Sequence, residues 1–139
     1  MLCGTQPILS MRALAGALEV WEDVELDQVR EKSLRLTDLF IDLVEEGCGS
    51  FGVTLAAPHE RTTRGSQVSL RHPHGCEIMQ ALIDQGVIGD FRSPDFMRFG
   101  FAPLYLSYTD VYVAATILHD ILANGTWRAA RFANRATVT

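Results

Sequence analysis

The chain has 139 residues, of which 47% are hydrophobic and 21% are charged, and its formal net charge is -5. This composition is that of one ordinary packed soluble domain and excludes intrinsic disorder, while the acidic balance excludes a basic surface for nucleic acid. The apolar runs are shorter than the roughly 18 to 20 residues that cross a bilayer, and the N-terminus lacks a basic segment followed by a long apolar stretch. We therefore expect a cytoplasmic protein with neither a membrane nor a nucleic-acid partner.

Two helices are expected before the first strand. Pro7 fits the first turn of a helix, and apolar residues recur at helical spacing up to Trp21, which predicts a helix over about 6–23 that packs with the next one. From Leu26 apolar residues again step by three or four, with charged residues between them, and this pattern ends near Gly47. It predicts a long amphipathic second helix.

The middle of the chain alternates between strand and helix patterns. Residues 53–57 and 66–72 have β-branched or alternating character, which predicts two strands, and the polar segment "PHERTTRG" between them predicts an exposed loop. Pro73 can begin a third helix, whose apolar pattern ends at Gly86.

The last third of the chain adds two strands and a helix. Residues 87–92 read as a strand, "SPD" turns the chain, and the apolar stretch 95–108 follows. Thr109 is a plausible N-cap for a last helix that stops at Asn124-Gly125. We expect one domain over 1–139 of the α/β class, an α+β layer in which helices cover a small, mostly antiparallel sheet of about four strands.

The apolar stretch "DFMRFGFAPLYLSY" contains one charged side chain in its middle, Arg98. In a strand, alternate side chains share a face, so one face carries Phe96, Arg98 and Gly100, and the other carries Met97, Phe99 and Phe101. Arginine stays charged in proteins, and its planar fork suits a carboxylate held by two hydrogen bonds. The residues alone leave two sources of that carboxylate open, a ligand or an internal aspartate: Asp90, Asp95 or Asp110.

The segment "CGTQP" at the start of the chain is a second candidate site. Gly4 and Thr5 just ahead of a helix bring together free backbone N–H groups, a hydroxyl and the positive end of the helix dipole, which suits a phosphate. The alternative is that Thr5 only caps the helix.

Histidine and cysteine give no convincing metal site. "HPHGC" offers His72, His74 and Cys76, but Pro73 and the expected helix start separate their directions, and no second cluster completes a four-ligand set. We expect no metal.

The three cysteines and the single lysine do not indicate a reactive site either. The three cysteines are far apart and odd in number, which favours reduced thiols over a disulfide framework. Lys32, the only lysine, lies on the polar face of the second expected helix, where we predict a solvated role.

Four segments of the chain resemble the C-terminal small domain of kynureninase, a pyridoxal-phosphate enzyme of the aspartate-aminotransferase fold type. They are "GTQPILSMRALAGAL", "KSLRLTDLFIDLV", "RGSQVSLRHPHG" and "GVIGDFRSPDFMRFGFAPLYLSYTDVY", and together they extend the resemblance over nearly the whole chain. The last segment is the most specific, since its pattern of Asp90, Arg92, Pro94, Arg98 and Pro103-Leu104-Tyr105 has the spacing of that family. The same pattern argues against another small domain of this architecture, that of a cysteine desulfurase.

The resemblance implies a homodimeric enzyme of tryptophan catabolism. Such an enzyme uses pyridoxal phosphate to hydrolyse L-kynurenine to anthranilate and L-alanine, or 3-hydroxykynurenine to 3-hydroxyanthranilate. Arg98 matches the family arginine that binds the substrate α-carboxylate. Thr5, with Gly4 beside it, matches the residue that reaches the cofactor phosphate across the dimer interface, although Gln6 stands where proline is common.

The resemblance also implies that the catalytic residues lie elsewhere. The lysine that carries the cofactor belongs to the family's large domain, and Lys32 matches a surface helix position instead. We expect the chain to be inactive alone: a fragment, a reading frame truncated at Met1, or half of a split enzyme whose partner is the large domain or a full-length subunit. The alternative is a non-catalytic interaction or regulatory domain, with self-association driven by exposed apolar residues of the first helix: Ile8, Leu9, Leu14 and Leu18.

Overall fold

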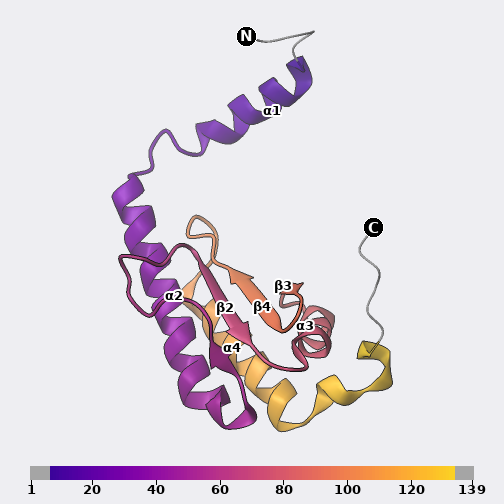
Figure 1. Ribbon diagram of the computed structural model, residues 1–139. Helices are drawn as coiled ribbons and strands as arrows, with labels where there is room; N and C mark the ends of the chain where they lie inside the picture. Colours follow the sequence, from indigo (N-terminus) through magenta and orange to yellow (C-terminus); the bar gives the residue numbers. More distant parts are fainter. Residues whose placement is uncertain (1–6, 134–139) are drawn as a thin grey trace.

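The computed structural model describes residues 7–133 and contains four α-helices and four strands (Figure 1). In chain order the elements are α1 (Ile8–Glu19), α2 (Leu26–Cys48), β1 (Thr54–Leu55), β2 (Gln67–Arg71), α3 (Gly75–Asp84), β3 (Asp90–Arg92), β4 (Phe96–Gly100) and α4 (Tyr108–Ala123). Single 3-10 turns lie at Gly49–Phe51, Thr126–Arg128 and Ala130–Phe132. The predicted order of helices and strands is confirmed, as is the mixed α/β class.

The four strands form one antiparallel sheet in the order β1-β2-β4-β3. Its inner face buries the alternate residues Val68 and Leu70 of β2 and Met97 and Phe99 of β4. Helices α2 and α3 contact the sheet, and α4 packs against both of these helices. The opposite face of β2 and β4 carries partly exposed side chains, so the sheet has one covered face and one open face.

The hydrophobic core lies between the covered face of the sheet and the helices. Phe40 of α2 packs its ring 5.0 Å from Phe99 and 5.3 Å from Phe101, measured between ring centroids. Leu36 of α2 and Leu118 of α4 are fully buried in the same cluster. These contacts fix β4 in place, and β4 carries Arg98 on its other face.

Helix α1 departs from the prediction in length and in packing. It ends at Glu19 instead of residue 23, and none of its twelve residues is buried. In Figure 1 it lies away from the sheet, joined to α2 by a short connection. The expectation that the two N-terminal helices pack together is therefore wrong, because nothing in residues 7–133 covers the apolar side chains of α1.

The last helix begins earlier than predicted. Ser107, not Thr109, is its N-cap: Ser107 Oγ accepts from the Asp110 backbone N–H at 3.2 Å, and Asp110 Oδ2 accepts from the Ser107 N–H at 2.8 Å. This reciprocal pair is a capping box, which needs a carboxylate three residues after the cap. Asp110 meets that spacing for Ser107, and Thr109 lies inside the helix.

The strands are shorter than their sequence patterns suggested, and so is α3. The expected strand 53–57 is reduced to residues 54–55, the expected strand 87–92 to residues 90–92, and the expected stretch 95–108 to residues 96–100. Helix α3 begins two residues after Pro73. After Phe101, whose N–H donates to Ser66 O, the chain reaches Pro103, which has no N–H to continue a ladder.

The segment between β1 and β2 is anchored to α2 instead of being a wholly exposed loop. The side chain of Arg64 is 2% exposed and pairs through Nη2 with Asp38 Oδ1. Its Nη1 donates to the carbonyl of His59 at 2.9 Å and its Nε to Thr37 Oγ1 at 3.2 Å. Sequence reasoning missed this buried arginine, because polar composition does not distinguish a solvated loop from one whose backbone is satisfied by a single buried side chain.

Two cysteines of the described chain, Cys48 and Cys76, are buried and unbonded, and Cys3 lies outside the described residues. Burial raises the pKa of the Cys48 thiol to about 11, so it stays protonated at neutral pH. Among the helices of residues 7–133, none combines the length and the apolar character that spanning a membrane requires.

His72 is buried beside the start of α3 with both ring nitrogens engaged. Its Nδ1 accepts from the His74 backbone N–H at 3.0 Å, and its Nε2 lies 3.2 Å from the carbonyl of Phe51. A ring that accepts at Nδ1 and donates at Nε2 is neutral. Burial, more than the neighbouring His74, lowers the pKa of His72 below its ordinary value.

The neutral His72 predicts a loss of stability in mild acid. In the unfolded chain the imidazole takes up a proton near its ordinary pKa of about 6.5, whereas the folded chain resists protonation until a lower pH. The unfolded state then binds more protons, so the contribution of His72 to the free energy of unfolding is present above about pH 6.5 and is lost as the pH falls below it. Urea unfolding of the wild type and of His72→Gln across this range measures it. The advantage of the wild type should shrink on acidification, and a pH-independent difference between the two proteins would contradict this.

Candidate functional site

Arg98 lies at the centre of the open sheet face. It occupies the middle of β4, directly opposite Ser69 of β2 on one side and Asp90 of β3 on the other. Its side chain is 33% exposed, while its neighbours Met97 and Phe99 are buried on the other face. The predicted alternation is therefore confirmed for the strand, and the guanidinium is held where two neighbouring strands support it.

Asp90 is the internal partner of Arg98. Arg98 Nη2 donates to Asp90 Oδ2, and Arg92 Nε lies 3.0 Å from the same oxygen. The hydrogen bond from Arg98, before any other influence, holds the pKa of the Asp90 carboxyl below its usual range. Of the other two aspartates considered, Asp95 pairs with Arg71 and Asp110 caps α4.

The pair with Asp90 leaves part of the Arg98 fork without a partner. Arg98 Nε is buried, and no hydrogen-bond acceptor for it exists among the described residues. A buried donor without an acceptor costs about 1–3 kcal/mol, so such groups are rare in folded proteins and call for an explanation such as a functional role, an ordered water or an ion. The remaining donors of Arg98 fit a carboxylate that this part of the chain does not itself supply.

Gly89 lets the chain approach Arg98 closely. A Cβ at this position would lie 2.9 Å from the carbonyl oxygen of Arg98 and 2.7 Å from Cε of Met79, both closer than side chains allow. The segment before β3 therefore lies directly against the backbone of β4. This contact helps to bring Asp90 opposite Arg98.

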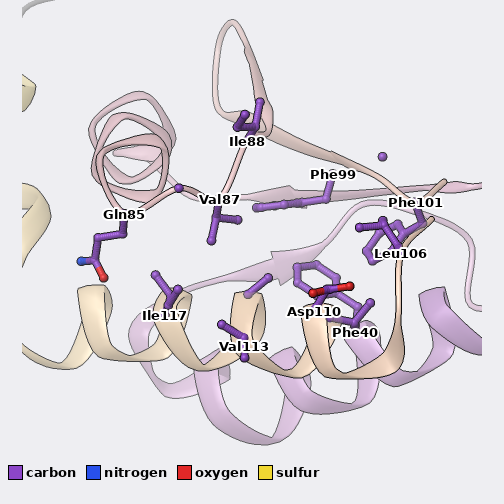
Figure 2. Close-up of a pocket in the computed structure, with 14 residues that line it drawn as sticks. Phe40, Gln85, Val87, Ile88, Phe99, Phe101, Leu106, Asp110, Val113 and Ile117 are labelled. Carbon is purple, nitrogen blue, oxygen red and sulfur yellow. The ribbon is translucent and has the colours of Figure 1, made fainter.

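The apolar cavity of the domain lies apart from Arg98. Figure 2 shows it between α4 and the strand that carries Phe99, with Ile88 at its rim; its volume is about 340 Å³. Phe40, Phe99 and Phe101 line it, and all three belong to the covered side of the sheet. Arg98 points to the opposite face, so the cavity and the guanidinium do not form one site.

These features define a class of protein: a small α+β domain that presents a partly engaged arginine on the open face of an antiparallel sheet. The family model of the kynureninase C-terminal domain matches residues 29–118. The chain belongs to the kynureninase C-terminal domain family, which confirms the resemblance seen in the sequence.

Named relatives agree with the family match. The chain is 51% identical over 138 residues to kynureninase of Pseudomonas fluorescens, and equally to the kynureninases of Burkholderia mallei strain SAVP1 and Burkholderia pseudomallei strain K96243. The match covers 99% of this chain and 33% of each relative. The chain therefore spans about a third of the length of the curated relatives it matches.

The described residues do not fit covalent attachment of pyridoxal phosphate. Lys32 is the only lysine of the sequence, and its Nζ donates to the carbonyl of Pro103 at 2.6 Å, partly buried. The predicted solvated role of Lys32 is thus wrong: the lysine tethers the loop between β4 and α4 to α2. Thr5 and Gly4, the expected phosphate contacts, lie outside the described residues. Within residues 7–133 no group of three or more His, Cys, Asp or Glu side chains is placed to hold a metal ion.

Proposed function

We propose that this chain forms one wall of a kynureninase active site. In this role Arg98 binds the α-carboxylate of L-kynurenine or of 3-hydroxykynurenine, which the assembled enzyme hydrolyses to alanine and the corresponding anthranilate. The observation that carries the proposal is the guanidinium of Arg98 on the open sheet face, where the side chain is 33% exposed and is paired with a single oxygen of Asp90. Membership of the kynureninase C-terminal domain family indicates the reaction, and Arg98 indicates the contact with the substrate carboxylate.

Recognition of a carboxylate by Arg98 follows from the geometry of the guanidinium. Its planar donors form two parallel hydrogen bonds to a carboxylate, which fixes both the position and the orientation of the substrate. Pyridoxal phosphate, when bound, supplies an electron sink for the carbon chemistry. Because Lys32, the only lysine of the sequence, is engaged with the carbonyl of Pro103, we place the covalent anchor of this cofactor in another segment.

The exposed helix α1 supports a partner that carries the remainder of the enzyme. Its side chains of Leu9 and Leu14 are 86% and 59% exposed, and apolar helices of this kind are normally covered. The family match begins at residue 29, inside α2, so α1 lies outside the range that the family model matches. We place α1 against a kynureninase large domain, in a cytoplasmic homodimer where Thr5 and Gly4 contact the cofactor phosphate across the interface.

A chimeric enzyme tests this proposal. Residues 1–139 replace the C-terminal third of Pseudomonas fluorescens kynureninase, the part to which they are 51% identical. We expect the purified chimera to bind pyridoxal phosphate and to release anthranilate from L-kynurenine, measured by anthranilate fluorescence. The 139-residue chain alone with added cofactor serves as the control and should release none.

Two outcomes would contradict the proposal. A chimera that is folded, dimeric and loaded with cofactor but releases no product would remove this chain from the active site. Activity of the isolated chain, especially if lost in Lys32→Gln, would show that the anchor is not elsewhere.

A further inference from the structure

We propose that Asp90 and Arg92 are positioning residues for Arg98, with separate tasks: Asp90 fixes the orientation of the guanidinium, and Arg92 restores the positive charge that Asp90 cancels. The inference rests on the proposed function, in which Arg98 receives the substrate carboxylate. According to this inference, Asp90 and Arg92 set the orientation and the net charge with which Arg98 meets that carboxylate.

The three side chains meet at a single oxygen atom. Asp90 Oδ2 accepts from Arg98 Nη2 and lies 3.0 Å from Arg92 Nε. Asp90 is directly opposite Arg98 in the ladder between β3 and β4, and Arg92, two residues further along β3, is on the same face. The strand register therefore builds this cluster.

The contact with Asp90 holds the guanidinium without closing it. It engages Nη2 through one carboxylate oxygen, and the buried Nε stays free of any acceptor in the described chain. A guanidinium fixed before binding loses less conformational freedom when a carboxylate arrives, so more of the interaction energy serves recognition.

A second arginine on the same face shows the contrasting arrangement. Arg71 donates from Nε to Asp95 Oδ2 at 3.0 Å and from Nη2 to the same carboxylate at 2.8 Å. That pair is closed, because the Nε and Nη2 edge of the fork is occupied. The pair of Arg98 with Asp90 uses Nη2 alone, and Nε of Arg98 has no acceptor in the described chain, so the guanidinium of Arg98 is engaged less completely than that of Arg71.

The role of Arg92 follows from its positive charge. Arg98 and Asp90 together are neutral, and a neutral pair attracts a carboxylate less strongly than a free guanidinium does. With Arg92 on the same oxygen the cluster carries a formal charge of about +1, which favours an anion at short range and at low ionic strength. Since the side chain of Arg92 is 65% exposed, its contribution is modest and sensitive to salt.

The first test observes the guanidinium in the 139-residue chain by nitrogen-15 NMR. In the wild type we expect slow rotation about the Nε–Cζ bond of Arg98, seen as separate Nη1 and Nη2 signals. Asp90→Asn should average these signals, and Asp90→Glu should partly restore their separation. The matched control Asp95→Asn acts on the closed pair of Arg71 and should leave Arg98 unchanged. Averaged Arg98 signals in the wild type, or separate ones in Asp90→Asn, would overturn the orienting role of Asp90.

The second test separates the two tasks kinetically in the chimera. Asp90→Asn should lower kcat about tenfold without raising KM, because the carboxylate is still attracted but the substrate is poorly oriented. Arg92→Gln should raise KM about threefold with little change in kcat, and this increase should fade at high salt. Arg71→Gln is the control and should change neither constant.

The outcomes distinguish this inference from the proposed function. If Arg98→Gln raises KM strongly while Asp90→Asn and Arg92→Gln match the wild type, the positioning roles are refuted and the carboxylate site stands. If Arg98→Gln itself leaves KM unchanged, the carboxylate site fails, and the inference fails with it.

Discussion

Arg98→Lys in the chimera is expected to raise the KM for L-kynurenine by about tenfold or more, although the positive charge is retained. Lysine offers a compact ammonium in place of a planar fork, so it cannot hold a carboxylate through two parallel hydrogen bonds. It also cannot keep the contact with Asp90 and an incoming carboxylate in the same geometry. Steady-state kinetics with L-kynurenine measure the effect, and Arg98→Gln should be more severe because the charge is lost as well.

The control for this substitution is Arg71→Lys, two residues away across the open face, opposite Phe96 in the register of β2 and β4. Arg71 has its own closed pair with Asp95, so its replacement should leave the KM within twofold of the wild type, in line with the small effect of exposed ion pairs. Equal effects of the two lysine substitutions would mean that the open face responds to charge in general, and a KM unchanged in Arg98→Lys would remove the fork from substrate binding.

Arg64→Leu is expected to lower the free energy of unfolding of the 139-residue chain by about 3 kcal/mol. The leucine fills part of the space but leaves Asp38, the hydroxyl of Thr37 and the carbonyl of His59 without the donor that now satisfies them. The value is placed at the low end of the range for breaking a buried pair because Asp38 is 33% exposed and keeps a contact with Arg61 at 2.9 Å. Urea denaturation followed by circular dichroism measures it.

A matched arginine on α2 provides the comparison. Arg35 pairs with Glu31 at 2.8 Å on the exposed surface, so Arg35→Leu should leave the urea midpoint unchanged. The double variant Arg64→Leu with Asp38→Leu should recover part of the lost stability, since the uncompensated carboxylate is then removed as well. If Arg64→Leu is as stable as Arg35→Leu, the buried arginine does not anchor the loop.

Periodicity was a reliable guide where a single face of an element is buried. The alternation in 96–100 predicted which side of β4 carries Arg98, and the three-and-four spacing in α2 predicted a long helix, because each pattern reflects burial of one face. The same rules failed at the ends of elements. Local backbone hydrogen bonding sets these ends, through the capping box of Ser107 and Asp110 and the missing N–H of Pro103. The spacing of hydrophobic residues does not show such effects.

The candidate site shows the same division. That Arg98 needs an anion follows from its chemistry, and the motif from Asp90 to Tyr105 was enough to recognise the kynureninase C-terminal domain family. The sequence did not predict which aspartate pairs with Arg98, because Asp90, Asp95 and Asp110 are all nearby in sequence. The antiparallel register of β3 and β4 selects Asp90. The unpartnered Nε is visible only in three dimensions, since it depends on what surrounds the atom.

The chain's composition, apolar periodicity and motif thus determined its fold class and its family and made Arg98 the candidate for anion binding, because these depend on burial patterns and residue chemistry that the sequence displays directly. The partner of Arg98, the anchoring role of Arg64 and the exposure of α1 were settled by the folded chain. Each of these depends on whether side chains or surfaces that are distant in sequence meet when strands align and helices pack. A sequence pattern does not show which of several equivalent groups will meet.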